Sequence, residues 1–471
     1  MKKPILFLIF LISFFVNAQV TIVEENIKNN KISINTHFFP ESNSMFIFKG
    51  KGLETYSIDS YGIDGIRKDF INNVKLYGNI FSKSDKILMS SDISLGIYKA
   101  KTKYIVNGKL LDSDFDDRRY IQYVSENFFT SKYAFSLKNQ KGKYDIDLLK
   151  DDINLVVTDI FNKKSVVSKI EKPNLDKLVG SNFIKAKENL GFKLTINYDE
   201  TIDFVTKSIS KDYTNSILYK TRISHEGKKI NELVYDLKIP NHIFIYSNNG
   251  GGKFTIGGYD NKFKHFGDDL SINNYIEDTS NGDIYIFGLY GDEPGKLNDM
   301  ANPKGYYIFK FDKSGKNIWE SINKIDDTDF NKGHVMTTVF VDLVHLNNNV
   351  CLSIKVNGLK DFFGYSIIDK VKGSIKKSEN LEINETFAHL DDTDNNRFNI
   401  NSNFKNLKEL KNKKFNFNSL IAFNSNPKFA EYIKNLKSEN NMYLHSQFSD
   451  KGIWLYESAE NEYYKLTFFK D

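Results

Sequence analysis

Residues 307–320 read Tyr-Ile-Phe-Lys-Phe-Asp-Lys-Ser-Gly-Lys-Asn-Ile-Trp-Glu, and residues 219–232 read Tyr-Lys-Thr-Arg-Ile-Ser-His-Glu-Gly-Lys-Lys-Ile-Asn-Glu. They align without a gap, and both place Gly-Lys at the same point, Ile two residues later and Glu at the end. Aromatic and β-branched residues before the glycine are typical of a strand, and glycine supplies the positive φ of a tight hairpin turn. The two stretches therefore predict copies of one β-hairpin.

Short runs of the same kind, such as residues 44–48, 283–288 and 306–311, occur along most of the chain. The composition agrees, because 39 Phe and 26 Tyr accompany only 7 Pro, which suits strands joined by tight turns. The single cysteine, Cys351, lies in such a run, and we expect a small core residue rather than a reactive thiol. A β core without disulfides must therefore hold the body together.

The spacing of the hairpins bears on the architecture. Gly227 and Gly315 are 88 residues apart, which is twice 44 and close to the roughly 40–50 residues of a four-stranded propeller blade. Gly315 and Gly373 are 58 residues apart, so the repeat is uneven. We take the spacing to indicate repeated blades.

The segment Phe311–Trp319 resembles the outer hairpin of bacterial secreted β-propeller repeats of the quinoprotein-like type. In that type a strand runs into Asp, then into a turn ending in Gly-Lys, and Trp follows four residues after the glycine. This chain has one residue fewer between Asp312 and Gly315, and only this copy carries the Trp. The resemblance covers about one blade; it implies a propeller and carries over no functional residue.

We expect residues 19–471 to form one all-β domain, a β-propeller of about six to eight blades. No Pro- or Ser-rich linker divides this stretch, and tandem β-sandwiches are the alternative architecture. The last strand-like segment, residues 462–469, is expected to pair with N-terminal strands. Such a pairing would close the ring and remove an exposed strand edge.

Residues 378–440 break the β pattern and are expected to form an insertion or loop. Its first part, residues 378–416, is rich in Asn, Asp and Lys. Residues 427–436 have apolar side chains at helical spacing, and Pro427 suits a first helical turn after a cap from Asn424 to Asn426. A short amphipathic helix is therefore predicted within the insertion.

The chain begins with the three parts of a secretory leader. Two lysines precede an unbroken apolar run from Ile5 to Val16, and Ala18 provides a small residue before Gln19. The run is shorter than the roughly 20 apolar residues of a membrane-spanning helix. We therefore expect residues 1–18 to be a signal peptide, and the mature chain to be periplasmic, extracellular or associated with the cell surface.

The remaining sequence excludes two kinds of partner. No second long apolar run follows the leader, so no membrane span is expected in the mature chain. The formal net charge of +5 falls to about +3 without the leader lysines. That charge is too small for binding driven by phosphate neutralisation, so no nucleic-acid partner is expected.

The candidate metal and phosphate motifs fail their own spacing rules. Residues 391–396 open like a calcium loop, but Arg397 stands where glycine is needed and Asn403 where the closing Glu is needed. The acidic stretch 326–329 is weaker still, and residues 112–117, followed by Arg118 and Arg119, are expected to form a surface turn whose charges compensate one another. Residues 248–253, Asn-Asn-Gly-Gly-Gly-Lys, precede Phe rather than the Ser or Thr of a phosphate loop, so we expect a hairpin there.

No catalytic residue is assigned from the sequence. The eight histidines show no zinc-binding spacing, and no Gly-x-Ser-x-Gly elbow occurs. Trp319 and Trp454 are candidate sugar platforms, but we expect them to pack between blades, because large aromatic side chains are usually mostly buried. We therefore expect no metal and no cofactor; a quinone is disfavoured because only one Trp hairpin fits that family.

These observations favour an exported binding or scaffold protein with a protein or glycan partner. A secreted hydrolase acting on polysaccharide is the alternative, because the chain is large, exported and rich in acids and aromatics. Three or more carboxylates converging on a central funnel, one with a raised pKa, would favour the enzyme. Lys, Asn and apolar groups there would favour the binding protein.

Overall fold

The chain divides into two compact units. Unit 1 comprises Met1–Lys75, His345–Asn348 and Phe387–Asp471, and unit 2 comprises Leu76–Val344 and Asn349–Thr386. The expected signal peptide lies outside the part of the chain that the structure describes. The computed structural model describes residues 19–27, 32–39, 42–51, 55–75, 79–84, 87–91, 102–106, 109–113, 133–142, 151–159, 164–171, 192–197, 199, 201–209, 214–247, 254–256, 275–291, 303–328, 330, 336–358, 362–380, 397–399, 413–436, 442–459 and 462–470.

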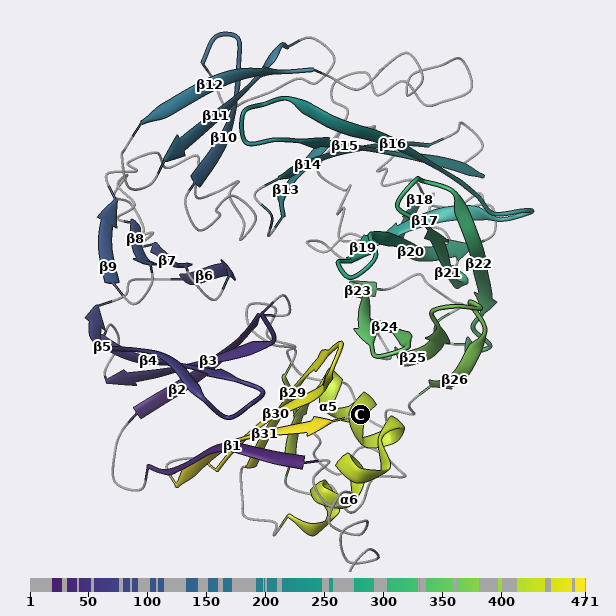
Figure 1. The fold of residues 1–471 in the computed structure, drawn as a ribbon. Helices are drawn as coiled ribbons and strands as arrows, with labels where there is room; N and C mark the ends of the chain where they lie inside the picture. Colours follow the sequence, from purple (N-terminus) through teal and green to yellow (C-terminus); the bar gives the residue numbers. More distant parts are fainter. Residues whose placement is uncertain are drawn as a thin grey trace, which may run out of the picture. The chain divides into compact units, whose positions relative to one another are not determined.

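The described strands form seven sheets, and nearly every strand pairs antiparallel with a neighbour in sequence (Figure 1). Alternating β-branched and aromatic residues explain this, since such side chains pack well on a pleated surface. The described helices are α5 (Phe417–Ser425) and α6 (Pro427–Asn435). The expectation of a mostly β chain is therefore confirmed.

Unit 1 contains two sheets, which pack face to face around a cluster that includes Ile47, Trp454 and Phe468. The first is a meander of β2 (Ile32–Phe39), β3 (Ser44–Lys51), β4 (Thr55–Gly62) and β5 (Arg67–Lys75). The second has the order β1-β31-β30-β29-β28-β27, with β1 (Gln19–Asn26), β27 (Arg397–Asn399), β28 (Lys413–Asn416), β29 (Met442–Ser449), β30 (Gly452–Ala459) and β31 (Tyr463–Lys470).

The N-terminal strand completes the C-terminal sheet. β1 pairs antiparallel with β31, from Gln19 opposite Phe469 to Asn26 opposite Tyr463. The predicted pairing of residues 462–469 with an N-terminal strand is confirmed. It covers one edge of β31, which would otherwise expose unpaired backbone groups.

The predicted helix near the C-terminus is confirmed as α6. The Asn426 side chain accepts the Phe429 backbone N–H at 3.0 Å, and Pro427 occupies the first turn, where its missing N–H costs nothing. The buried Lys413 Nζ donates to the backbone oxygens of Ile433 and Leu436 at the far end. Both ends of the helix are thereby satisfied.

Part of the predicted loop at 378–416 is regular structure. β28 runs parallel to β29, and α5 and α6 form the crossover between them. The helix α5 is missed by the sequence reading, because its residues are apolar on several sides and lack helical spacing. It is set by the Asn416 side chain, which accepts the Ser419 N–H at 3.0 Å.

Unit 2 contains five sheets, formed by consecutive strands. The first two are β6 (Asn79–Ser84), β7 (Ile87–Ser91), β8 (Thr102–Val106) and β9 (Lys109–Ser113), then β10 (Tyr133–Asn139), β11 (Ile153–Asp159) and β12 (Ser165–Ile170). The third is β13 (Phe192–Ile196), β14 (Ile202–Ile209), β15 (Asn215–Ile223) and β16 (Lys229–Lys238). The fourth is β17 (Ile243–Ser247), β18 (Phe254–Ile256), β19 (Tyr275–Asp278), β20 (Asp283–Gly291), β21 (Pro303–Phe311) and β22 (Asn317–Lys324). The fifth is β23 (Met336–Leu346), β24 (Asn349–Gly358), β25 (Phe362–Asp369) and β26 (Ile375–Asn380).

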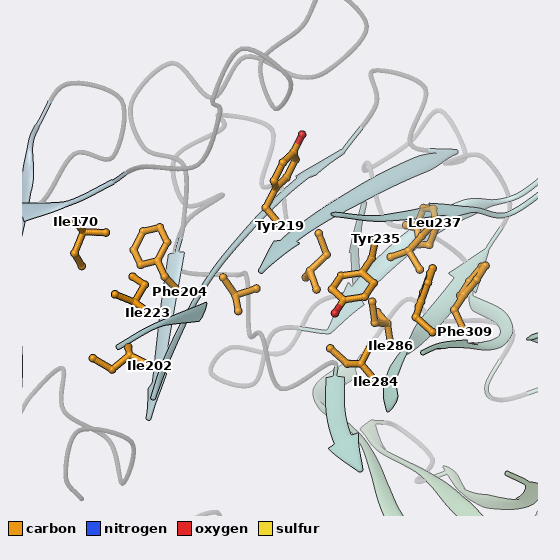
Figure 2. Packing of buried hydrophobic residues seen from close by; sticks show 14 of the residues in the cluster. Ile170, Ile202, Phe204, Tyr219, Ile223, Tyr235, Leu237, Ile284, Ile286 and Phe309 are labelled. Carbon is orange, nitrogen blue, oxygen red and sulfur yellow. The ribbon is translucent and has the colours of Figure 1, made fainter. Parts of the chain in front are cut away.

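Four consecutive sheets of unit 2, from β10 to β26, stack on one another. One core cluster joins the sheets of β10–β12, β13–β16 and β17–β22, and Figure 2 shows part of it. Alternate residues of β20 divide between two cores: Ile284 and Ile286 belong to this cluster, and Tyr285 and Phe287 to the cluster shared with β23–β26. The β17–β22 sheet is therefore buried on both faces.

The two aligned hairpins have the same structure. In each, a β-bulge precedes the turn, where pairing shifts between Arg222 and Ile223 and between Lys310 and Phe311. Gly227 and Gly315 have φ of 82° and 84°, a backbone conformation that glycine adopts more easily than other residues. The interval of 88 residues, however, spans consecutive sheets, because the described strands between them, β17 to β20, all belong to the sheet of β21. Reading this interval as two repeats of 44 residues was therefore wrong.

Candidate functional site

A buried charged cluster joins two sheets of unit 2. Arg222 on β15 donates from Nε and Nη2 to Asp203 Oδ1 and Oδ2 at 2.7 and 2.9 Å, and Lys220 Nζ lies 3.1 Å from Oδ2. Glu277, on β19 of the next sheet, places Oε2 2.5 Å from Lys220 Nζ and 2.8 Å from Arg222 Nη2. Two acids and two bases thus neutralise one another.

The titration of this cluster follows from its contacts. Burial acts to raise the pKa of Asp203, but the hydrogen bond from Arg222 and the charge of Lys220 outweigh it, and the pKa is lowered. The same bond raises the pKa of Arg222. Asp203 and Arg222 therefore stay charged at neutral pH, so neither is suited to exchange protons there.

Unit 1 contains a cluster of the same residue types. Asp59 on β4 lies between Lys49 Nζ, at 3.0 Å, and Arg67 Nε, at 2.8 Å. Glu25 comes from β1 in the neighbouring sheet, and its Oε2 accepts from both Lys49 and the Tyr464 hydroxyl. Here too the charges tie one sheet to the next.

A third link joins the sheets of β17–β22 and β23–β26. Lys310 Nζ lies 2.8 Å from Asp283 Oδ2 and donates to the Lys370 backbone oxygen at 3.0 Å. The same oxygen accepts from Trp319 Nε1 at 3.0 Å, and Lys370 Nζ lies 3.1 Å from Asp278 Oδ2. These charged residues serve to connect sheets.

Glu457 of unit 1 is a buried carboxylate of a different kind. It lies on β30, and the Tyr432 hydroxyl of α6 donates to its Oε2 at 2.8 Å. Burial raises the pKa of Glu457 above its ordinary value, although this hydrogen bond and Lys465 oppose the rise. Glu457 thus holds α6 on the sheet, although burial of its charged form is unfavourable.

Asp342 on β23 is the strongest candidate for acid–base chemistry. Its side chain is accessible to solvent, yet the protein packed around it displaces enough water to raise its pKa to about 6. The only opposing contact is the Leu343 backbone N–H, at 2.9 Å. Cys351 on β24 is fully buried, which raises the pKa of its thiol. The core role predicted for Cys351 is confirmed.

The two ends of the unit 2 sheets differ in their connections. In a four-stranded meander, the connections from strand one to two and from three to four leave one end, which we call the turn end. In the sheets of β13–β16 and β17–β22 these are short turns at 197–201, 224–228, 279–282 and 312–316. The opposite end, the long-connection end, carries the links through residues 92–101, 114–132, 292–302 and 325–335, together with shorter links at 210–214, 239–242 and 359–361.

One sheet of unit 2 also has a divided first strand. β17 pairs with one half of β20, Ile243 opposite Gly291, and β19 pairs with the other half, Asp278 opposite Asp283. The stretch between them includes β18, which pairs antiparallel with β17. Residues 248–253, where a hairpin is expected, lie outside the described residues.

The other acidic candidates give no site. Asp326 pairs with Lys324 at 2.5 Å, and Asp327 accepts the Phe330 backbone N–H at 2.9 Å, which is a local cap. The calcium-like stretch 391–396 and residues 114–117 lie outside the described residues. Within the described part of the chain, no group of three or more His, Cys, Asp and Glu side chains could hold a metal ion.

Both tryptophans pack between sheets, as predicted. Trp454 is fully buried, its ring lies 5.0 Å from that of Phe468, and its Nε1 donates to Asn43 Oδ1 at 3.0 Å. Trp319 is partly buried and contacts the turn at Gly373, where a methyl group on the glycine would lie 2.6 Å from Trp319 Cδ2. Neither side chain is a free sugar platform.

No protein-family model and no curated protein matches the chain. Among solved structures, the WD40 domain of SCAP from fission yeast is similar at 7% identity and a TM-score of 0.27, covering 95% of this chain and 98% of that one. The six-bladed β-propeller lectin of Aleuria aurantia has 8% identity and a TM-score of 0.25, covering 75% and 97%. Quinohemoprotein alcohol dehydrogenase from Comamonas testosteroni has 6% identity and a TM-score of 0.31, covering 96% and 77%. TM-scores this low assign no fold; the architecture follows from the chain's own strand pairing.

Among the described residues, no helix has the length and apolar character needed to cross a membrane.

Proposed function

We propose that the chain is an exported β-propeller of seven blades that binds a protein or glycan partner in the periplasm or at the cell surface. The seven sheets of consecutive strands support the architecture. Neighbouring sheets share cores in both units, and β1 completes the last sheet. Completion of the last blade by the N-terminal strand is a device that removes an edge from a closed ring.

The difference between the two ends of the unit 2 sheets carries the proposal of binding. Ligand-contacting residues concentrate on loops held by a rigid scaffold, and several links of ten or more residues connect strands at the long-connection end. The link at 114–132 contains Tyr120, Tyr123, Phe128 and Phe129. Aromatic side chains of this kind dominate protein interfaces and stack on sugar rings.

The buried charges favour binding over catalysis. The acids of the clusters are neutralised by Lys and Arg inside the fold, and their role is to hold neighbouring sheets together. A hydrolase of polysaccharide is the second candidate, and Asp342 is the observation that favours it. A glycosidase would need a second carboxylate within about 5–10 Å of this acid.

Binding is tested with the chain from Gln19 onward on an immobilised glycan panel. We expect the Tyr120→Ser/Tyr123→Ser variant to lose about tenfold or more in affinity for any glycan retained, because aromatic anchors carry much of such binding. The matched control is Val166→Ser/Val167→Ser, which alters two exposed residues of β12. Equal glycan binding by both variants would contradict the proposal that the long-connection end binds the partner.

Export and catalysis have separate readouts. Fractionation of cells that express the full chain is expected to place it outside the cytoplasm with Gln19 as the first residue, and a cytoplasmic chain that retains residues 1–18 would contradict export. Turnover of a polysaccharide panel that disappears in Asp342→Asn would replace the binding proposal with the hydrolase.

A further inference from the structure

The outer hairpins display exposed aliphatic side chains that the fold does not use. In unit 2, Val371 is 75% exposed, Ile230 54% and Ile318 46%. Each lies at or just after the turn that joins the last two strands of its sheet. The matching turn of unit 1 carries Ile66, which is 63% exposed. Ile230 and Ile318 occupy the same position, three residues after the turn glycine, whereas Val371 and Ile66 lie within their turns. Scattered exposed apolar residues are normal, but an aliphatic tip at each of these hairpins requires a cause.

The β-bulges explain how two of these side chains become exposed. Ile223 pairs with Lys229 and Arg222 with Asn231, so Ile230 has no partner across the ladder. Ile318 occupies the same position, because Phe311 pairs with Asn317 and Lys310 with Trp319. A bulge re-aims the side chain of its extra residue. The isoleucine shared by the two aligned sequences is thus directed away from the sheet.

The three hairpins of unit 2 lie next to one another. A methyl group on Gly315 would lie 3.5 Å from Leu233 of β16, in the preceding sheet, and one on Gly373 would lie 2.6 Å from Trp319 of β22. Each turn therefore packs against the outer strand of the sheet before it. We call the exposed residues Ile230, Ile318 and Val371, with Lys313, Lys316 and Lys372, the hairpin ridge.

The acidic and basic side chains of these hairpins differ in their surroundings. Asp312 Oδ1 accepts from the backbone N–H groups of Ser314 and Lys316 at 2.8 and 3.0 Å, and Asp369 Oδ1 accepts from those of Val371 and Lys372 at 2.9 Å. The carboxylates are therefore occupied within the turns. The side chains of Lys313, Lys316 and Lys372 are exposed. The same hairpins also expose two acids near their turns, but Glu226 pairs with Lys228 at 2.7 Å and Glu320 accepts from the Asn317 side chain. The hairpins therefore combine aliphatic tips with lysines that outnumber the exposed acids.

We propose that the hairpin ridge docks on the surface of an anionic lipid bilayer. Aliphatic side chains that protrude beside lysines suit the boundary between headgroups and acyl chains, where apolar burial and attraction to anionic lipid act together. A second copy presenting the same ridge would bring like charges together. The proposal concerns the turn end, and it stands independently of the partner proposed for the long-connection end.

The test is co-sedimentation of the chain from Gln19 onward with lipid vesicles, since the apolar leader would itself bind lipid. Vesicles of phosphatidylcholine alone are compared with vesicles that also contain phosphatidylglycerol. We expect binding to the anionic vesicles only, weakened by salt because exposed charges are screened. The Ile230→Ser/Ile318→Ser/Val371→Ser variant is expected to bind at least about tenfold more weakly.

The control variant is Val166→Ser, an exposed aliphatic on β12 outside the ridge, which is expected to bind as the parent chain does. Near-ultraviolet circular dichroism shows whether each variant keeps its packing. Absence of vesicle binding, equal binding to neutral vesicles, or equal loss in the control would each overturn the proposal. Loss of glycan or protein binding with vesicle binding intact would contradict only the proposed function.

Discussion

The charged clusters of the two units use the same residue types in different arrangements. In unit 2, Arg222 contacts both acids and grips Asp203 through two nitrogens. In unit 1, Arg67 touches Asp59 through Nε, and Lys49 reaches both acids instead. The arginine side chain is 21% exposed in unit 2 and 45% exposed in unit 1. The arginine of the unit 2 cluster is therefore more shielded from solvent than the arginine of the unit 1 cluster.

This difference indicates where each cluster derives its strength. A two-nitrogen Arg–carboxylate contact fixes geometry as well as charge, whereas an exposed ion pair contributes little because water competes for both partners. The unit 2 cluster should therefore tolerate loss of a member poorly. The unit 1 cluster should tolerate loss of its arginine well.

The largest effect is expected from Asp203→Ala. It would leave Lys220 and Arg222 without their shared buried acid, which costs about 3–5 kcal/mol in the free energy of unfolding. Asp59→Ala is expected to cost less, about 1–3 kcal/mol, because Arg67 can turn to solvent. Urea denaturation followed by tryptophan fluorescence measures both, and equal losses would remove the contrast between the clusters.

The dependence of the unfolding free energy on pH in the acid range is a second test of the contacts of Asp203. Its pKa is lowered in the folded chain, so its contribution is present above the unfolded value of about 3.8 and is lost as pH falls through the folded value. Asp203→Asn should flatten the fall of unfolding free energy with acid. An unchanged pH dependence would contradict the role given to Arg222 and Lys220.

The next largest effect concerns turns of equal shape in different surroundings. Gly373 in unit 2 has φ of 70° and abuts Trp319, while Gly65 in unit 1 has φ of 76° and open space around it. We expect Gly373→Ala to cost about 2–4 kcal/mol, from backbone strain and overpacking together. Gly65→Ala should cost about 1–2 kcal/mol, from strain alone. Thermal unfolding measures both variants. Equal decreases in melting temperature would show that the Trp319 side chain moves aside without cost.

A smaller contrast is expected from conservative changes at the two arginines. Arg222→Lys loses the two-nitrogen contact, for which about 1.5–3 kcal/mol is expected. Arg67→Lys should cost under about 1 kcal/mol, because its side chain is largely hydrated already. Chemical denaturation of both variants at low salt would show the gap, and a larger loss at Arg67 would reverse the comparison.

The smallest effect is expected at Glu457, whose pKa is shifted opposite to that of Asp203. Because the folded pKa is raised, protonation favours the fold below the unfolded value, and this benefit is lost as pH rises through the folded value. Glu457→Gln keeps an acceptor for Tyr432 and removes the buried charge. A small gain in melting temperature at pH 7 that vanishes in acid would confirm this, and a loss at pH 7 would contradict it.

Much of the fold could be predicted from local sequence. The aligned hairpins at 219–232 and 307–320, the helix after Asn426 and the pairing of residues 462–469 all depend on short-range turn, cap and strand chemistry. The blade interval and α5 could not be predicted in this way. The interval is distorted by the stretch inserted between β17 and β19, and α5 depends on its partner strand β29 rather than on helical spacing.

The sites depend on contacts that a linear reading does not contain. Asp203 and Glu277 are 74 residues apart and meet only because two sheets stack. Asp342 has an ordinary sequence context, and its raised pKa arises from the atoms packed around it. The hairpin ridge had a visible signal in the repeated isoleucine, but its exposure follows from a bulge that the sequence does not display.

The pairing of β1 with β31 has a mechanical consequence. Gln19 lies opposite Phe469, so the N-terminal end of β1 and the C-terminal end of β31 lie at the same end of one ladder. Tension applied between residues 19 and 470 would break the hydrogen bonds between the two strands one after another, starting at Gln19 and ending at Asn26. An attachment through residue 470 and a loop between β1 and β2 would shear all the bonds at once. The direction of pull would thus decide whether this sheet is weak or strong.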